Sequence, residues 1–291
     1  MTAMQPEDLI KGSIRLVSLP EIFVRINEMV EDPATSATDV GKYICQDPAL
    51  TARLLKIANS PLYGFPSRID TISRAITIIG LRGIRDLVLA SSTVEVFSRM
   101  SSELIDMNRY WQHSLYCAVS ARTLAGHCNA LHMEPFFIAG LLHDIGQLII
   151  LHKLPEMARE THLRAGDSGM PLSQIEQEVI GFDHIQVGVE LLRFWRLPPS
   201  ILDAVGCHQN PERAEEGPLG AAIIHIADCL ASRVYPLIAN DSARKSMSDE
   251  APIQPVALEI TGLPMSIGEE IREEVEVQFS AMQSVLLSQA A

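Results

Sequence analysis

The sequence predicts an all-α fold in two helical subdomains, and three observations lead to that prediction. Apolar residues recur at helical spacing in nearly every segment, and the alternation typical of β-strands is scarce. Aspartate, serine, glycine and proline stand where these segments would begin and end, as helix caps do. The 291 residues, 47% of them hydrophobic, suffice for one large or two modest domains with a sizeable core.

The first subdomain is predicted over residues 14–105. Ser36 is expected to cap one helix, Asp47 followed by Pro48 another, and Gly80 to separate the last two. A loop rich in turn formers, "SPLYGFPSRID", interrupts the helices. The amphipathic segments are at residues 20–30, 36–45, 47–59, 71–80 and 81–98.

The second subdomain is predicted over residues 106–240, after a polar stretch near residues 100–106. Its helices are expected at residues 108–128, 139–150, 172–180, 184–195, 199–209 and 218–238. The remainder, residues 241–291, would hold an exposed polar loop and a last amphipathic helix at 266–287. The apolar stripe of that helix could pack on its own domain or on a partner, so no oligomeric state is predicted. The stripe consists of Ile267, Ile271, Val275, Phe279, Met282 and Leu286.

Composition restricts the classes of function. The net charge of −13 and the pI near 5.1 argue against DNA binding, which depends on a basic surface. The amino terminus lacks the pattern of a signal peptide, and no apolar run approaches the roughly 20 residues of a membrane span. The five cysteines form no CxxC pair, which favours reduced core thiols. We therefore expect a soluble cytoplasmic protein with no membrane partner.

The stretch "AGLLHDIGQLII" at residues 139–150 places a histidine and an aspartate in an apolar run. A buried ionised carboxylate costs several kcal/mol unless it is paired. His113, His184 and His208 also fall on apolar faces, each on a different predicted helix from His143. A single histidine of this kind is usually an ordinary core residue, but four of them favour a common site.

Two carboxylates complete the pattern. Asp144 follows His143, and Asp228 shares a helical face with Ile224, Ala231 and Tyr235. Buried imidazoles and carboxylates without a lysine partner are typical of a metal centre. A hydrogen-bonded network of histidines and aspartates without a metal fits the spacing equally well. Both interpretations remain open at this point.

The order His…His-Asp…His…His…Asp around "GLLHDIG" resembles the HD superfamily of metal-dependent phosphohydrolases. Several longer blocks are similar to the HDOD family, over about residues 14–240. They include "DPALTARLLKIANSPLYG" at 47–64, "TISRAITIIGLRGIRDLVL" at 71–89 and "FDHIQVGVELLRFWRLPPSILDAVGCHQ" at 182–209. The resemblance implies that the second subdomain is an HD-domain-like helical bundle.

The resemblance also implies a ligand set. The single-metal pattern of HD enzymes maps onto His113, His143, Asp144 and Asp228, and the metal would be divalent Fe, Mn, Ni or Zn. His184 and His208 are candidates for a second metal or a phosphate. The chain departs from the binuclear phosphodiesterases at three positions of that pattern and lacks their "GYP" signature. The departures are Arg109 in place of a glutamate, Gln147 in place of a lysine and Gln209 in place of a histidine.

Three functions follow from these observations. The first is a regulatory module of bacterial signal transduction, weakly catalytic or non-catalytic, which binds other signalling proteins. Arg53, Lys56 and Asn59, along one helix, are candidates for partner docking, with a plain solvated helix face as the alternative. The second function is a phosphohydrolase for a nucleotide or cyclic dinucleotide. The third is binding of a nucleotide ligand without hydrolysis, for which the chain has no glycine-rich phosphate motif.

Overall fold

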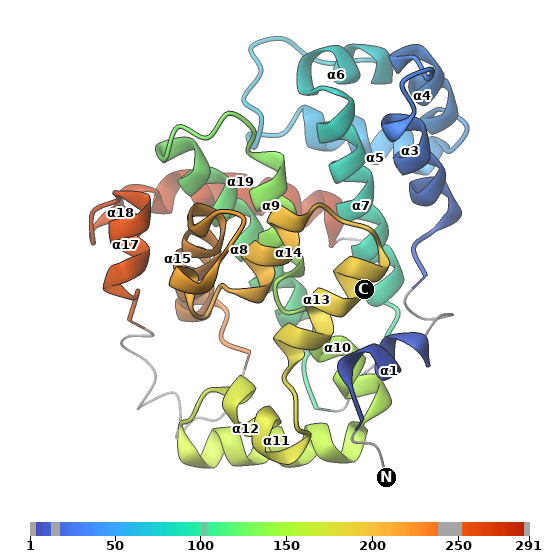
Figure 1. The fold of residues 1–291 in the computed structure, drawn as a ribbon. Helices are drawn as coiled ribbons and strands as arrows, with labels where there is room; N and C mark the ends of the chain where they lie inside the picture. The colour runs from blue at the N-terminus through green and yellow to red at the C-terminus, as the bar shows by residue number, and fades with distance from the viewer. Residues whose placement is uncertain (1–3, 13–17, 101, 103, 238–251, 288–291) are drawn as a thin grey trace. The chain divides into compact units, whose positions relative to one another are not determined.

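A computed structural model describes residues 4–12, 18–100, 102, 104–237 and 252–287 (Figure 1). Over these ranges the chain forms α-helices, one short 3₁₀ helix and no β-strand, which confirms the predicted all-α class. The helices belong to two compact units. One unit combines residues 1–18 with 101–271, and the other combines residues 19–100 with 272–291. Most of the predicted polar loop, at 238–251, lies outside the described residues.

The smaller unit consists of five helices of the first hundred residues and the last helix of the chain. The predicted caps are present: the Ser36 side chain accepts from Asp39 N–H, the Asp47 side chain accepts from Ala49 and Leu50 N–H, and Gly80 ends a helix. The helices are α3 (Glu21–Glu31), α4 (Ala37–Ile44), α5 (Pro48–Ala58), α6 (Ile72–Ile79), α7 (Leu81–Phe97) and α19 (Arg272–Leu286).

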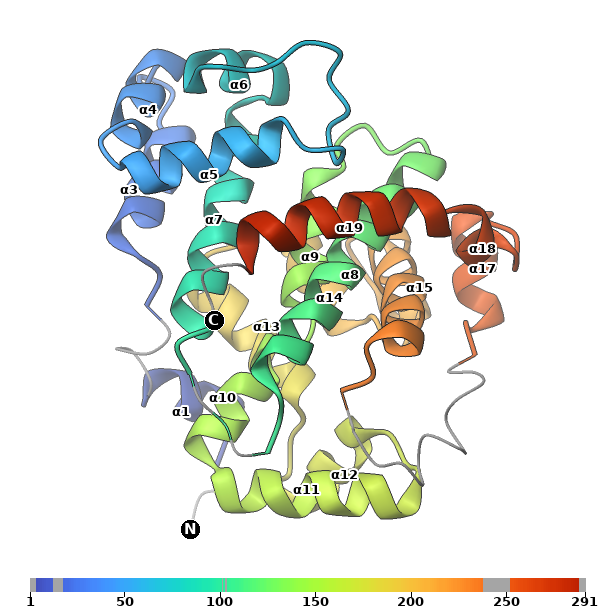
Figure 2. The same cartoon turned by 180° about the vertical axis from the view of Figure 1, so that it is seen from behind.

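Helix α19 belongs to the smaller unit although residues 101–271 of the other unit separate it in sequence from the rest. It packs on α5 (Figure 2), and the Ser60 hydroxyl lies 3.7 Å from the sulfur of Met282. The predicted apolar stripe from Ile267 to Leu286 is buried throughout. The stripe therefore packs on the chain itself, and residues 241–291 do not form a separate unit.

The larger unit is a helical bundle. Its central helices are α8, α9 and α15, which pack on one another, and α14 packs on α9 and α15. Helices α10 and α13 pack together beside them. The helices are α1 (Pro6–Lys11), α8 (Met107–His127), α9 (Glu134–Leu142), α10 (Ile145–Lys153), α11 (Pro155–Ser168), α12 (Leu172–Val179), α13 (His184–Phe194), α14 (Pro199–Gly206), η1 (Pro211–Arg213), α15 (Pro218–Val234), α17 (Pro255–Thr261) and α18 (Ile267–Glu270).

Some elements differ from the sequence prediction. Helix α11 lies between the predicted helices at 139–150 and 172–180 and was not itself predicted. Its buried face consists of Ala158, Thr161 and Ala165, which are too small to make an apolar stripe visible. Helices α1 and α17 are short and were not predicted. The predicted helix at 266–287 is two helices, α18 and α19.

Two further expectations concern burial. All five cysteines are free thiols, but Cys45 is exposed and so is not a core residue; it follows the end of α4. By length and composition, the stretch Glu134–Lys153 could cross a membrane, yet 83% of its most apolar window is buried inside the protein.

Candidate metal centre

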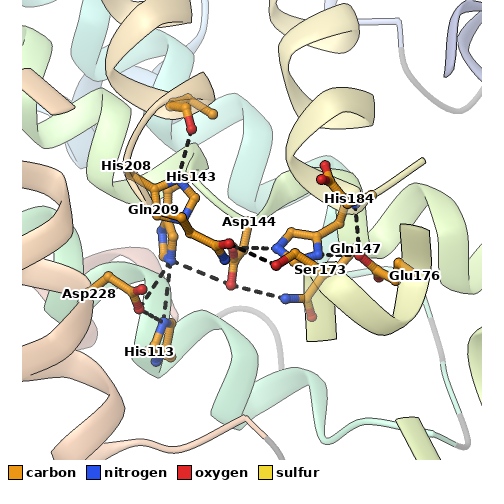
Figure 3. A network of polar contacts seen from close by, with 12 residues as sticks. His113, His143, Asp144, Gln147, Ser173, Glu176, His184, His208, Gln209 and Asp228 are labelled. Atoms are coloured by element: carbon orange, nitrogen blue, oxygen red, sulfur yellow. Dashed lines mark hydrogen bonds and ion pairs between the residues drawn. The ribbon is translucent and has the colours of Figure 1, made fainter. Parts of the chain in front are cut away.

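Two helices and one helix junction bring the predicted ligands together (Figure 3). His113 lies on α8 and Asp228 on α15, two helices that pack along each other. His143 and Asp144 lie between α9 and α10. His113 and His143 are 1% and 0% exposed, so the site is built into the core of the bundle.

The His-Asp pair interrupts a helix that the sequence predicted to be continuous. Helix α9 ends at Leu142, and α10 begins at Ile145. His143 keeps helical backbone angles, whereas Asp144 leaves them, with φ −107° and ψ 11°. On a regular helix, neighbouring side chains point about 100° apart. The break lets the side chains of His143 and Asp144 reach the same region.

The closest ligand atoms belong to His113, His143 and Asp228. Nε2 of His113 lies 3.4 Å from Nε2 of His143 and 3.2 Å from Oδ1 of Asp228. Nε2 of His143 lies 3.6 Å from the same oxygen. Every pair of these three atoms is within 4.8 Å, a spacing that one metal ion could bridge.

Backbone carbonyls fix the orientation of both imidazole rings. Nδ1 of His113 donates to the carbonyl of Tyr235 at 3.0 Å, and Nδ1 of His143 donates to that of Gly140 at 2.8 Å. In a neutral ring this bond leaves Nε2 unprotonated, so two lone pairs and a carboxylate face one another without a hydrogen between them. A cation must neutralise this arrangement, either a metal or a proton. The donor set and the carbonyl support are those of a divalent metal site.

Asp144 lies on the other side of His143. Its Oδ2 is 3.4 Å from His143 Nε2 and accepts a hydrogen bond of 3.0 Å from the Gln147 amide. Its Oδ1 lies 3.3 Å from His184 Nε2. Asp144 is not in the group of three mutually close ligand atoms, so its role as a metal ligand stays a prediction.

The two candidate residues for a second ion are placed differently. Nδ1 of His184 lies 2.5 Å from the Glu176 carboxylate, so both ring nitrogens face acidic groups. His208 donates from Nδ1 to the Val205 carbonyl at 2.7 Å, and its ring stands edge-on to that of His143, with centroids 5.4 Å apart. Neither belongs to a group of three close ligands among the described residues.

The glutamines that replace family residues have partners of their own. Gln147 bonds to Asp144, and the Gln209 side chain accepts a 2.7 Å bond from the Ser173 hydroxyl. Among the described residues, Asp144 and Asp228 form ion pairs with histidines and with no arginine or lysine. The buried Arg122 pairs instead with Glu134, at 3.9 Å.

Two buried residues near the site were not singled out from the sequence. Glu176, 1% exposed on α12, bonds to His184. His225, 7% exposed on α15, donates from Nδ1 to the carbonyl of His208 and accepts from the N–H of Gln254. Glu176 lies in a polar segment, "SQIEQE", where nothing local marks it as buried. His225 follows three apolar residues and could have been found by the criterion applied to the other histidines.

Electrostatics couple His143 and Asp228. Burial alone would lower the pKa of His143, but Asp144, Cys117 and Asp228 together hold this pKa well above 6.5. Burial alone would raise the pKa of Asp228, but the adjacent His113 and His143 rings hold it well below 3.8. In the absence of metal, His143 is thus the group that carries the neutralising proton.

These directions predict opposite pH dependences for folding and for metal binding. The raised pKa of His143 stabilises the fold below about pH 6.5 and is lost as pH rises through its folded value. The lowered pKa of Asp228 stabilises the fold above about pH 3.8 and is lost as pH falls. The stability that the pair gives the metal-free protein should be greatest between these values. Metal affinity should rise with pH, by up to about tenfold per unit, because His143 must release its proton.

Urea unfolding of the metal-free parent and of His143→Gln at several pH values measures the first dependence, and calorimetric metal titrations measure the second. An affinity that does not change with pH would show that no proton leaves His143 on binding.

The docking candidates lie in the smaller unit and have internal contacts. Arg53 bonds to Ser91 at 2.6 Å and to Glu95 at 3.1 Å. The Asn59 amide accepts from the N–H of Ile69 and donates to its carbonyl, each at 2.8 Å, and so ties the ends of the loop between them. Lys56 is exposed. Docking at these residues stays a prediction.

Asn59→Ala is expected to lower the free energy of unfolding by about 1–2 kcal/mol, because the loop loses two hydrogen bonds to Ile69. Lys56→Ala, an exposed position on the same helix, should change it by less than about 0.5 kcal/mol. Urea denaturation of both variants checks this. Equal small effects would argue that Asn59 is dispensable for the fold.

Comparisons with known proteins agree with this architecture. The model of the HDOD domain family matches residues 16–211. An uncharacterized protein of Treponema pallidum is 27% identical over 198 residues, which are 68% of this chain but only 38% of that protein. This chain thus spans less than half the length of that relative.

Solved structures show the same fold. An HDOD domain protein of unknown function from Geobacter sulfurreducens superposes with a TM-score of 0.73 at 24% identity, over 97% of this chain and 98% of the other. A candidate phosphohydrolase from Shewanella amazonensis superposes with a TM-score of 0.72 at 24% identity, over 96% and 97%. With the family match covering two thirds of the sequence, the chain belongs to the HDOD domain family.

Proposed function

We propose that this chain is a regulatory module of bacterial signal transduction whose larger unit binds one divalent transition metal. His113, His143 and Asp228 would hold the ion, and Asp144 would complete the set. The observation that carries the proposal is the meeting of two Nε2 atoms and a carboxylate oxygen within 4.8 Å, with both Nδ1 atoms held by carbonyls. A divalent Fe, Mn, Ni or Zn ion suits imidazole and carboxylate ligands.

Weak or absent turnover is part of the proposal. A bound divalent ion would supply a polarised water and neutralise phosphate charge. Phosphoryl transfer also needs cationic groups that stabilise the developing charge. The ion-pair partners of the two aspartates are histidines, and Gln147 and Gln209 are engaged in hydrogen bonds with Asp144 and Ser173. The site thus retains a ligand set with little support for catalysis.

A phosphohydrolase acting on a nucleotide or cyclic dinucleotide is the second candidate. The Shewanella protein with this fold is named a phosphohydrolase, with no substrate in the name. The Asp228 side chain is 26% exposed, while the histidines around it are buried, so solvent reaches the site at this carboxylate. A phosphate ligand would approach the site from the side of Asp228.

For the chain as a whole, the proposal includes other signalling proteins as binding partners and a location in the cytoplasm.

The test measures metal content and turnover on the same preparations. The purified parent, loaded with Mn²⁺, Fe²⁺, Ni²⁺ or Zn²⁺ and freed of excess ion, is analysed for metal and assayed with bis(p-nitrophenyl) phosphate. About one ion per chain without measurable hydrolysis supports the regulatory module. One ion with hydrolysis that Asp144→Asn abolishes supports the phosphohydrolase. A chain that takes up none of these ions overturns the metal site in both.

A further inference from the structure

Helix α12 contributes two buried polar side chains to the site from outside the central bundle. Ser173 and Glu176 lie on its inner face, 7% and 1% exposed. Ser173 bonds to Gln209, and Glu176 bonds to His184. In Figure 3 both face the cluster of histidines and aspartates. Burying an ionised glutamate destabilises a fold unless the carboxylate is paired, so the groups that bond to Glu176 indicate its role.

One oxygen of Glu176 accepts two hydrogen bonds from the same residue. Oε2 lies 2.8 Å from the backbone nitrogen of His184 and 2.5 Å from its Nδ1. His184 is the first residue of α13, so its N–H has no acceptor within that helix. Glu176 provides the acceptor and at the same time holds the imidazole ring, which leaves the ring little freedom to rotate.

The fixed ring directs its other nitrogen at Asp144. Nε2 of His184 lies 3.3 Å from Oδ1 of Asp144, while Oδ2 of the same carboxylate faces His143 and Gln147. Asp144 therefore has one oxygen toward the three close ligand atoms and one toward His184.

We propose that Glu176 is a positioning residue of the metal centre: it fixes the His184 ring against Asp144 and so holds the carboxylate whose other oxygen faces the three close ligand atoms. The proposal deepens the proposed function, since the orientation of Asp144 matters for metal only if the centre binds it. The position of the ring itself is independent of metal.

The first experiment therefore uses the metal-free protein. NMR follows hydrogen exchange of the His184 amide and the proton signal of its ring Nδ1–H in the parent, Glu176→Gln and Glu176→Ala. The glutamine keeps an acceptor oxygen of the same reach, and the alanine removes it. In Glu176→Ala we expect loss of the ring signal and amide exchange faster by about 10- to 100-fold, the usual range for a hydrogen bond to a charged group. Glu176→Gln should restore slow exchange.

Ser173→Ala is the matched control, because Ser173 shares the helix face with Glu176 but bonds to Gln209. It should leave both His184 signals unchanged. If Glu176→Ala does not fold, Glu176→Asp, one methylene shorter, replaces it with the same expectation. An unchanged ring signal and unchanged exchange in the folded alanine or aspartate variant would overturn the positioning role. Failure of the glutamine to restore them would overturn it as well.

The second experiment is a Mn²⁺ titration followed by elemental analysis. The parent should bind one ion, and Glu176→Ala should bind it about 10- to 100-fold more weakly, as loss of an outer-shell partner does. An affinity of Glu176→Ala equal to that of the parent would show that the position of the His184 ring has no effect on the metal centre. No binding by the parent would refute the proposed metal site, whereas the metal-free NMR result would still decide whether Glu176 positions His184.

Discussion

Asp228→Asn is expected to reduce the affinity of the protein for a divalent metal by at least about 100-fold. Loss of a residue that merely supports a ligand costs 10- to 100-fold, and loss of a ligand should cost no less. Oδ1 of Asp228 lies 3.2 Å from Nε2 of His113 and 3.6 Å from Nε2 of His143. Asparagine keeps the volume of the side chain but supplies no negative charge, so the ion would lose the only carboxylate in the group of three close ligand atoms.

The control for this variant is His225→Gln. His225 lies one turn before Asp228 on α15 and is buried, but its nitrogens bond to the backbone of His208 and of Gln254. Its substitution should affect the packing of α17 and leave metal affinity within about twofold of the parent. Competition with a chromogenic chelator measures both variants. A parent-like affinity in Asp228→Asn would show that the ion, if bound, lies elsewhere.

Asp228 also illustrates how much of the site the sequence could reveal. Its helical face is shared with Ile224 and Ala231, and a helix has a fixed period, so its inward direction followed from the pattern alone. His113 could be placed by the same argument. The structure then brings these two residues, from α15 and α8, to His143 at the junction of α9 and α10. The sequence indicated this convergence only through its resemblance to a family.

The remaining features depend on long-range packing. The break at Asp144 has no proline or glycine at that position to signal it, and the apolar residues on both sides continue the helical pattern. Glu176 sits in a polar segment and is buried because α12 folds back on the start of α13. Helix α19 was recognised as amphipathic, but its partner α5 lies at the other end of the chain. No local pattern could pair them.

Gly146→Ala is expected to destabilise the larger unit by about 3 kcal/mol or more, at the upper end of the range for overpacked cores. A Cβ at this position would lie within van der Waals overlap of the backbone of α13, only 2.6 Å from the nitrogen of Gly188 and nearer still to the carbonyl oxygen of His184. Backbone atoms cannot rotate aside as a side chain can. Helices α10 and α13 would have to separate. This would break the contact between Asp144, which directly precedes α10, and His184, which begins α13.

Gly188→Ala separates this steric effect from the usual preference of helices for alanine. Gly188 faces Gly146 across the same contact, but its added Cβ would have its nearest neighbour at 3.5 Å, an ordinary contact. This variant should be neutral or more stable by up to about 1 kcal/mol, because alanine favours a helix over glycine. Thermal and urea unfolding compare the two. If both alanines were tolerated, α10 and α13 could not lie as close as the His184–Asp144 contact requires.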